Sequence, residues 1–176
     1  MTSPAPAPNE ASAEQSELTV QLRDTDDTST MARAFADLAM PGLCILLEGP
    51  VGAGKSFFAR SVIQNLMARH GGVEDVPSPT FTLVQTYDLG PLEVWHADLY
   101  RLTNPDELIE LGLDQAFETA LCLIEWPDRL GGLHPKGAVT LNLTPDPQNP
   151  DRRSARISGP ETLVARLRRA TESLSR

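Results

Sequence analysis

The segment GLCILLEGPVGAGKS, residues 42–56, decides the fold class of this chain. Its first half is a continuous aliphatic run, which is typical of a strand covered on both faces in a parallel sheet. Residues 49–56 then match the pattern G-x-x-x-x-G-K-[S/T] without adjustment. Beyond them, Phe58, Val62 and Leu66 recur at helical spacing. This succession of strand, glycine-rich turn and helix predicts a phosphate-binding loop in an α/β protein.

The loop has the composition that phosphate binding needs. Glycines let the backbone turn tightly, so that several N–H groups converge on phosphate oxygens at the positive end of the following helix. Lys55 would neutralise charge on the β and γ phosphates, and the Ser56 hydroxyl would ligate Mg²⁺. From the residue frequencies of this chain, a chance match is on the order of one in a thousand. The predicted phosphate-binding residues are Gly49, Gly52, Ala53, Gly54, Lys55, Ser56 and Phe57.

The remaining apolar runs predict a mixed sheet around this unit. Residues 18–22 alternate like a half-buried strand, and residues 119–126 form a second aliphatic run. The segments 81–90 and 92–102 meet at a Gly-Pro turn, as in a hairpin, while 138–146 and 153–159 read as an exposed two-stranded pair. We therefore expect an α/β P-loop NTPase fold, with a mixed sheet that has a parallel core and antiparallel additions, flanked by helices.

Three further helices are expected. The first starts at the polar residues 24–30, carries Met31, Phe35, Leu38 and Met40, and stops before Pro41. The second starts behind Pro105. The third spans residues 161–176, and its inward positions are Leu163, Leu167, Ala170 and Leu174.

Composition and charge limit the classes of function. The 176 residues carry 15 Lys+Arg and 24 Asp+Glu, a formal charge of −9, which is opposite to the basic footprint of an autonomous nucleic-acid binder. Residues 1–17 lack basic residues and an aliphatic run, so we interpret them as a disordered acidic tail rather than a targeting peptide, and 18–176 as a single domain. Cys44 and Cys122 lie in aliphatic runs and are expected to be reduced in a cytoplasmic protein that does not enter a membrane.

Two acids and a hydroxyl are candidates for catalysis. Asp98 and Glu125 each end a predicted strand, and parallel strands bring their carboxyl ends to the ligand crevice. Their spacing does not say which would ligate the metal and which would act on water, and either acid alone would serve equally well as a turn cap. Thr80 lies in SPTFT, which reads as a simple turn or, in a P-loop protein, as a loop that closes on the γ phosphate.

Three aromatic or imidazole side chains have blander interpretations. Trp126 would be a platform for the nucleotide base or an ordinary packing residue. His96 and His134 have no Cys or His at metal-ligand spacing, and we interpret both as structural.

Neither lysine of the chain follows an asparagine, so the Asn-Lys-x-Asp segment of small GTPases is absent, which favours ATP over GTP.

Together, GPVGAGKS, SPTFTLVQTY, HADLYRL, DELIELGLDQAF and LIEWPDRL resemble the TsaE family, the P-loop ATPases of bacterial tRNA threonylcarbamoyladenosine synthesis. The resemblance extends from about residue 22 to about residue 158. It implies an ATPase that uses ATP and Mg²⁺, binds the proteins TsaD and TsaB, and supports the modification of A37 in tRNA only indirectly, through that complex.

The resemblance also implies roles for individual residues. Lys55 and Ser56 match the phosphate and Mg²⁺ positions, Thr80 the switch threonine, Asp98 the acid of the HxDLYR motif, and Glu125 an acid near the metal. The nucleotide site of the family further draws on the regions around Thr25 and Arg153. The chain departs from the family at Pro50 and Ser56, where Asp and Thr are usual; serine can still ligate Mg²⁺, whereas proline removes an N–H and a carboxylate.

Two other functions fit a P-loop fold. A small-molecule kinase would use residues 128–137 as a lid over its acceptor. A nucleotide-switched binding module would change shape without meaningful hydrolysis.

Overall fold

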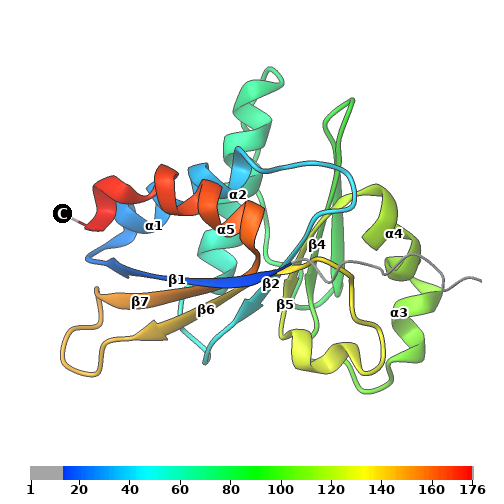
Figure 1. Ribbon diagram of the computed structural model, residues 1–176. Coiled ribbons are helices and arrows are strands. Elements are labelled where there is room, and N and C mark those ends of the chain that lie inside the picture. Colours follow the sequence, from blue (N-terminus) through cyan, green and yellow to red (C-terminus); the bar gives the residue numbers. More distant parts are fainter. Residues whose placement is uncertain (1–13, 176) are drawn as a thin grey trace, which may run out of the picture.

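A seven-stranded mixed sheet forms the centre of the protein (Figure 1). The computed structural model describes residues 14–175. The strands are β1 (Gln15–Leu22), β2 (Cys44–Glu48), β3 (Val84–Asp88), β4 (Glu93–Asp98), β5 (Leu121–Glu125), β6 (Val139–Pro145) and β7 (Arg153–Pro160). Their order is β1-β7-β6-β2-β5-β4-β3. β2 is parallel to β5 and β6, and β4 is parallel to β5, whereas β3 and β7 are antiparallel to their neighbours. The predicted parallel core with antiparallel additions is confirmed.

Helices cover the two faces of the sheet unequally. They are α1 (Thr25–Ala36), α2 (Lys55–Arg69), α3 (Asp106–Glu110), α4 (Leu113–Thr119) and α5 (Glu161–Ala170), with the 3-10 turns η1 (Pro127–Leu130) and η2 (Glu172–Ser175). The first two helices and α5 share one core with the sheet, and α3, α4 and η1 share a second core on its other face. Within residues 14–175, no helix is long and apolar enough to cross a membrane.

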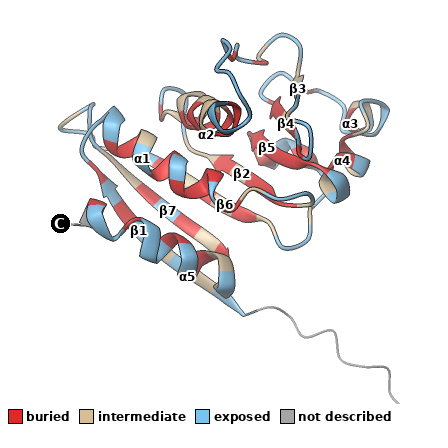
Figure 2. Cartoon of the chain, turned by 90° about the horizontal axis from the view of Figure 1, so that it is seen from above, coloured by how far each residue is buried: buried red, intermediate tan, exposed pale blue. Residues whose placement is uncertain are grey.

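Burial follows this arrangement strand by strand (Figure 2). All five residues of β5 are buried, because helices or turns cover both of its faces. In β6, Val139, Leu141 and Leu143 are buried while the residues between them are partly accessible. One uncovered face explains this alternation, which is the usual pattern of antiparallel additions.

The N-terminus of α1 is held by its own acids. Asp24 caps the helix by accepting a hydrogen bond from the Asp27 amide at 2.9 Å. The Arg23 guanidinium donates to the Asp27 carboxylate at 2.8 Å and lowers the pKa of Asp27 below its usual range. Further along, the Phe35 and Phe58 rings meet edge to face with centroids 5.1 Å apart, and so join α1 to α2.

Four expectations from the sequence need correction. β1 begins at Gln15 rather than residue 18, because residues 15–17 already pair with β7. The expected tail is therefore shorter than 17 residues, and residues 1–13 lie outside the described part of the chain. α1 ends at Ala36, which leaves Met40 44% exposed. The β6–β7 pair lies inside the sheet between β1 and β2 instead of being exposed. In α5, Val164 is buried whereas Ala170 is exposed.

The two cysteines occupy neighbouring positions in the parallel core. Cys44 of β2 is in register with Cys122 of β5, and both side chains are buried thiols. Burial raises the pKa of Cys122 to about 12 and that of Cys44 further still. Both therefore act as small core residues, as their aliphatic surroundings predicted.

Candidate functional site

The loop between β2 and α2 has glycines where its backbone passes close to other parts of the protein. Gly49 and Gly54 have φ angles of +136° and +100°. A Cβ atom would collide with the Leu143 carbonyl oxygen at Gly49 and with the Arg153 guanidinium at Gly54. Because the first N–H groups of a helix have no intrahelical partner, the start of α2 offers donors beside this cradle.

Lys55 is folded onto the loop that precedes it. Its side chain is only 4% exposed, and Nζ donates hydrogen bonds to the carbonyl oxygens of Gly49 and Pro50 at 2.7 and 2.9 Å. Nζ also lies 4.0 Å from the centroid of the Trp126 ring. Burial lowers the pKa of Lys55, although the nearby charges of Glu125 and Asp98 favour its ammonium form.

Asp98 and Glu125 lie side by side because β4 and β5 are parallel neighbours in register. The Ser56 hydroxyl donates to Glu125 Oε2 at 2.8 Å, so Glu125 contacts the P-loop directly. Asp98 instead accepts hydrogen bonds from the Thr80 hydroxyl at 3.2 Å and from the Tyr100 amide at 3.0 Å. Glu125 is therefore directed toward Ser56 of the P-loop, and Asp98 toward Thr80.

These groups surround one pocket of about 420 Å³. The predicted residues that line it are Gly52, Gly54, Lys55, Ser56, Phe57, Thr80, Asp98 and Glu125. Both carboxylates are buried, at 5% exposure for Asp98 and 2% for Glu125. Gly49 and the buried Ala53 belong to the loop without lining the pocket. Its oxygen donors, a hydroxyl and carboxylates, suit a hard cation such as Mg²⁺.

Thr25 and Arg153, which the family resemblance assigns to the nucleotide site, do not line this pocket. Arg153 Nη1 donates to the Ala53 carbonyl oxygen at 3.1 Å, and Arg153 lines a neighbouring cavity of about 530 Å³ together with Arg23 and Arg152. Thr25 is the exposed first residue of α1 and lines neither cavity. The structure therefore brings Arg153 to the P-loop, whereas the role of Thr25 stays a prediction.

Sequence reasoning missed one member of the site and left another open. His96 Nε2 lies 2.8 Å from Glu125 Oε1, and the imidazole is buried. Its position two residues before Asp98 on the same strand, and so on the same face, was a signal that the spacing argument did not use. Trp126 lines the pocket, and its ring contacts Lys55 and lies 4.9 Å, centroid to centroid, from Tyr100.

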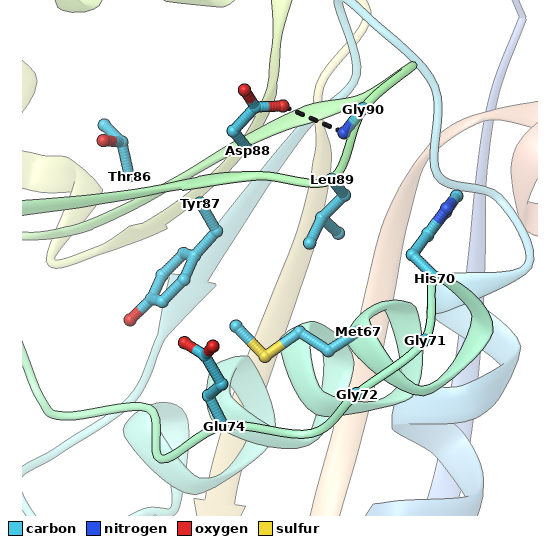
Figure 3. Close-up of a pocket in the computed structure, with 10 residues that line it drawn as sticks. All are labelled: Met67, His70, Gly71, Gly72, Glu74, Thr86, Tyr87, Asp88, Leu89 and Gly90. Atoms are coloured by element: carbon cyan, nitrogen blue, oxygen red, sulfur yellow. Dashed lines mark hydrogen bonds between the residues drawn. The ribbon is translucent and has the colours of Figure 1, made fainter.

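A second, larger hollow of about 640 Å³ lies at the other end of α2 (Figure 3). It is bounded by the end of that helix near Met67, by the segment that follows it, and by the β3–β4 hairpin. Tyr87 and Glu74 point into the same space, and Asp88 accepts a hydrogen bond from the Gly90 amide at 2.9 Å. α2 has 15 residues, so about 20 Å separates the two hollows. None of the predicted site residues lines this one.

The mixed sheet, the loop between β2 and α2, and the strand-terminal acids define the class: the protein has the P-loop NTPase fold. The sequence model of the family described as "Threonylcarbamoyl adenosine biosynthesis protein TsaE" matches residues 22–155. The chain therefore belongs to the TsaE family.

Individual relatives agree with this assignment. The tRNA threonylcarbamoyladenosine biosynthesis protein TsaE of Rickettsia bellii is 38% identical over 122 residues, which are 69% of this chain and 83% of the relative. The Haemophilus influenzae protein of the same name is 32% identical over 132 residues, 72% of this chain and 81% of the relative. The crystal structure of YdiB from Bacillus subtilis superposes with a TM-score of 0.71 at 25% identity and covers 89% of this chain and 97% of that one.

Proposed function

We propose that this protein binds MgATP and hydrolyses it as an accessory ATPase of tRNA threonylcarbamoyladenosine synthesis. The observation that carries the proposal is the hydrogen bond of 2.8 Å between Ser56 of the P-loop and the buried Glu125, beside Lys55 and in the same pocket as Asp98. A lysine, a hydroxyl and two carboxylates at a helix N-terminus are the set that phosphoryl transfer needs. Membership of the TsaE family supplies the pathway.

The chain has residues that fit both parts of the ligand. Gly49 and Gly54 let the loop backbone pass close to Leu143 and Arg153, and the Lys55 ammonium and the N-terminus of α2 would hold phosphates beside this loop. Ser56, with Glu125 behind it, would hold Mg²⁺, which supplies neutralisation of the charge on the transferred phosphoryl group. The Arg153 cavity beside Ala53 offers room for the base and sugar.

Each polar side chain then has a task set by its contacts. Lys55 exchanges the carbonyl oxygens of Gly49 and Pro50 for phosphate oxygens. Glu125 is proposed for the metal side, because it contacts Ser56, and Asp98 with Thr80 for the orientation of the attacking water. The contacts of the two acids support this division of roles, which their spacing along the chain left open.

The proposed partners are TsaD and TsaB, with tRNA reached only through them in the cytoplasm. Exposed apolar side chains gather at the mouth of the nucleotide pocket: Val51 is 75% exposed, Phe81 82% and Tyr100 47%. The Arg101 guanidinium lies 4.5 Å above the Phe81 ring. Apolar groups at this exposure suit contact with a protein, and the chain's charge of −9 does not suit contact with RNA.

The test is ATP hydrolysis by the protein alone and with a purified TsaD–TsaB pair, compared with Glu125→Gln. Glutamine keeps the shape of Glu125 and can still hydrogen-bond to Ser56, but it lacks the charge. We expect the rate to rise with the pair, and the variant to bind ATP within a few-fold of wild type while hydrolysing it about 100-fold or more slowly.

Three results would contradict separate parts of the proposal. An undiminished rate in Glu125→Gln would remove Glu125 from the chemistry. A rate that does not respond to the pair would contradict the partner assignment, and turnover that needs a small-molecule acceptor would favour a kinase. Residues 128–137, the lid that a kinase would need, do not line the pocket.

A further inference from the structure

A buried histidine holds the acid on which the proposed reaction depends. His96 is 1% exposed and Glu125 2%. The two residues are not opposite each other in the sheet: His96 is in register with Leu123 and Asp98 with Glu125. The imidazole therefore reaches along the same face to Glu125, where Nε2 lies 2.8 Å from Oε1.

The hydrogen-bond inventory decides the direction of this contact. An ionised carboxylate only accepts hydrogen bonds, so the proton between the two groups is on His96 Nε2. Nδ1, the other ring nitrogen, has no hydrogen-bond partner among residues 14–175. Nε2 is thus the ring nitrogen that has a protein partner in this part of the chain.

The two oxygens of Glu125 thus have different environments. Oε1 is occupied by His96 from inside the sheet, and Oε2 accepts the Ser56 hydroxyl from the P-loop. With Oε1 held, the carboxylate cannot rotate about its terminal bond without losing a buried hydrogen bond, which costs about 1–3 kcal/mol.

We propose that His96 is a positioning residue for the reaction: its Nε2–H fixes Glu125 so that Oε2 alone faces the P-loop serine and the metal side of the pocket. This inference rests on the proposed ATPase function. His96 does not line the pocket, and in this proposal it acts only through the carboxylate. Partners of this kind, one shell behind a functional ligand, change affinity or activity by about 10- to 100-fold when removed.

Two polar variants of similar size separate the hydrogen bond from mere packing. In His96→Gln, the side-chain amide nitrogen takes nearly the place of Nε2 and can donate to Glu125. In His96→Asn, the amide nitrogen takes the place of Nδ1 and does not reach it. Steady-state kcat and KM for ATP are measured for both and for wild type, together with melting temperatures.

We expect His96→Asn to lower kcat about 10- to 100-fold with KM for ATP within about threefold, and His96→Gln to recover most of the loss. Equal kcat values in His96→Asn and wild type would overturn the proposal. Equal losses in both variants, or a change confined to KM, would overturn it as well. Absence of turnover in wild type would instead refute the ATPase function itself, and this inference with it.

A second measurement reads the contact without turnover, in case His96→Asn does not fold. Nitrogen NMR of the wild-type histidines, with His96 assigned by its loss in His96→Gln, should show a proton on Nε2 and a nitrogen signal that shifts in Glu125→Gln. An Nε2 without a proton, or no response to Glu125→Gln, contradicts the proposal.

Discussion

The two hollows at opposite ends of α2 differ in what lines them, and the larger one has less chemistry. The hollow near Met67 measures about 640 Å³, but its acids Glu74 and Asp88 are exposed at its rim. The pocket at the P-loop measures about 420 Å³ and holds the buried Lys55 and Glu125. Volume alone therefore does not distinguish a functional site.

Burial of charge is what separates them. An ammonium or carboxylate removed from water loses several kcal/mol of solvation unless neighbours compensate. At the P-loop, two carbonyl oxygens compensate Lys55, and Ser56 and His96 compensate Glu125. Such an arrangement costs stability, so its presence at the head of α2 points to function there.

The largest effect is expected from Lys55→Ala. Loss of the ammonium removes the main positive charge available to the phosphates, so the affinity for ATP should fall at least about 100-fold, as expected for charged hydrogen bonds worth about 3 kcal/mol. Calorimetric titration with a non-hydrolysable ATP analogue measures it.

The chain offers a matched control, because its other lysine is the exposed Lys136. Lys136→Ala should bind the analogue like wild type. Unchanged affinity in Lys55→Ala would show that the P-loop does not bind phosphate and would erase the contrast between the two hollows.

An intermediate effect is expected from Asp98→Asn. Asparagine keeps an oxygen for the Tyr100 amide but removes the charge beside Thr80. If Asp98 orients water, turnover should fall about tenfold or more while nucleotide binding persists. A drop in binding without a drop in kcat would instead place Asp98 among the groups that hold the ligand.

Local patterns predicted most of the residues that line this pocket. The P-loop is contained in eight consecutive residues, and parallel strands bring their ends to one edge, so Lys55, Ser56, Asp98 and Glu125 were found without coordinates. The split between the two acids was not, because it depends on which of them faces α2 and which faces Thr80.

Contacts between neighbouring strands could not be predicted from the sequence. His96 and Glu125 are 29 residues apart, and their contact depends on the register of β4 against β5. In the same way, alternation in residues 138–146 showed one covered face but not that β7 and β1 would extend the sheet on that side. The period of apolar residues along a strand shows how many of its faces are covered, but it does not show which strand lies next to it in the sheet.

The smallest effect is expected in the other hollow, from Tyr87→Phe. The Tyr87 hydroxyl is buried and has no hydrogen-bond partner in the described part of the chain. Removal of an unsatisfied polar atom should leave stability unchanged or raise it by up to about 1 kcal/mol. ATP turnover should equal that of wild type; a turnover defect would mean that this hollow takes part in function.

The pH dependence of stability tests the same residue. Burial raises the pKa of the Tyr87 hydroxyl above its ordinary value of 10.0, and the charge of Asp75 adds to this. The folded state therefore holds the phenolic proton more tightly than the unfolded chain. The stability that wild type gains from this proton is complete below the ordinary pKa of 10.0 and is lost as the pH rises toward the folded pKa. Chemical denaturation should show Tyr87→Phe gaining on wild type above about pH 10. A constant difference across that range would mean that the hydroxyl ionises as freely in the folded protein as in the unfolded one, and that the larger hollow is open to water at its base.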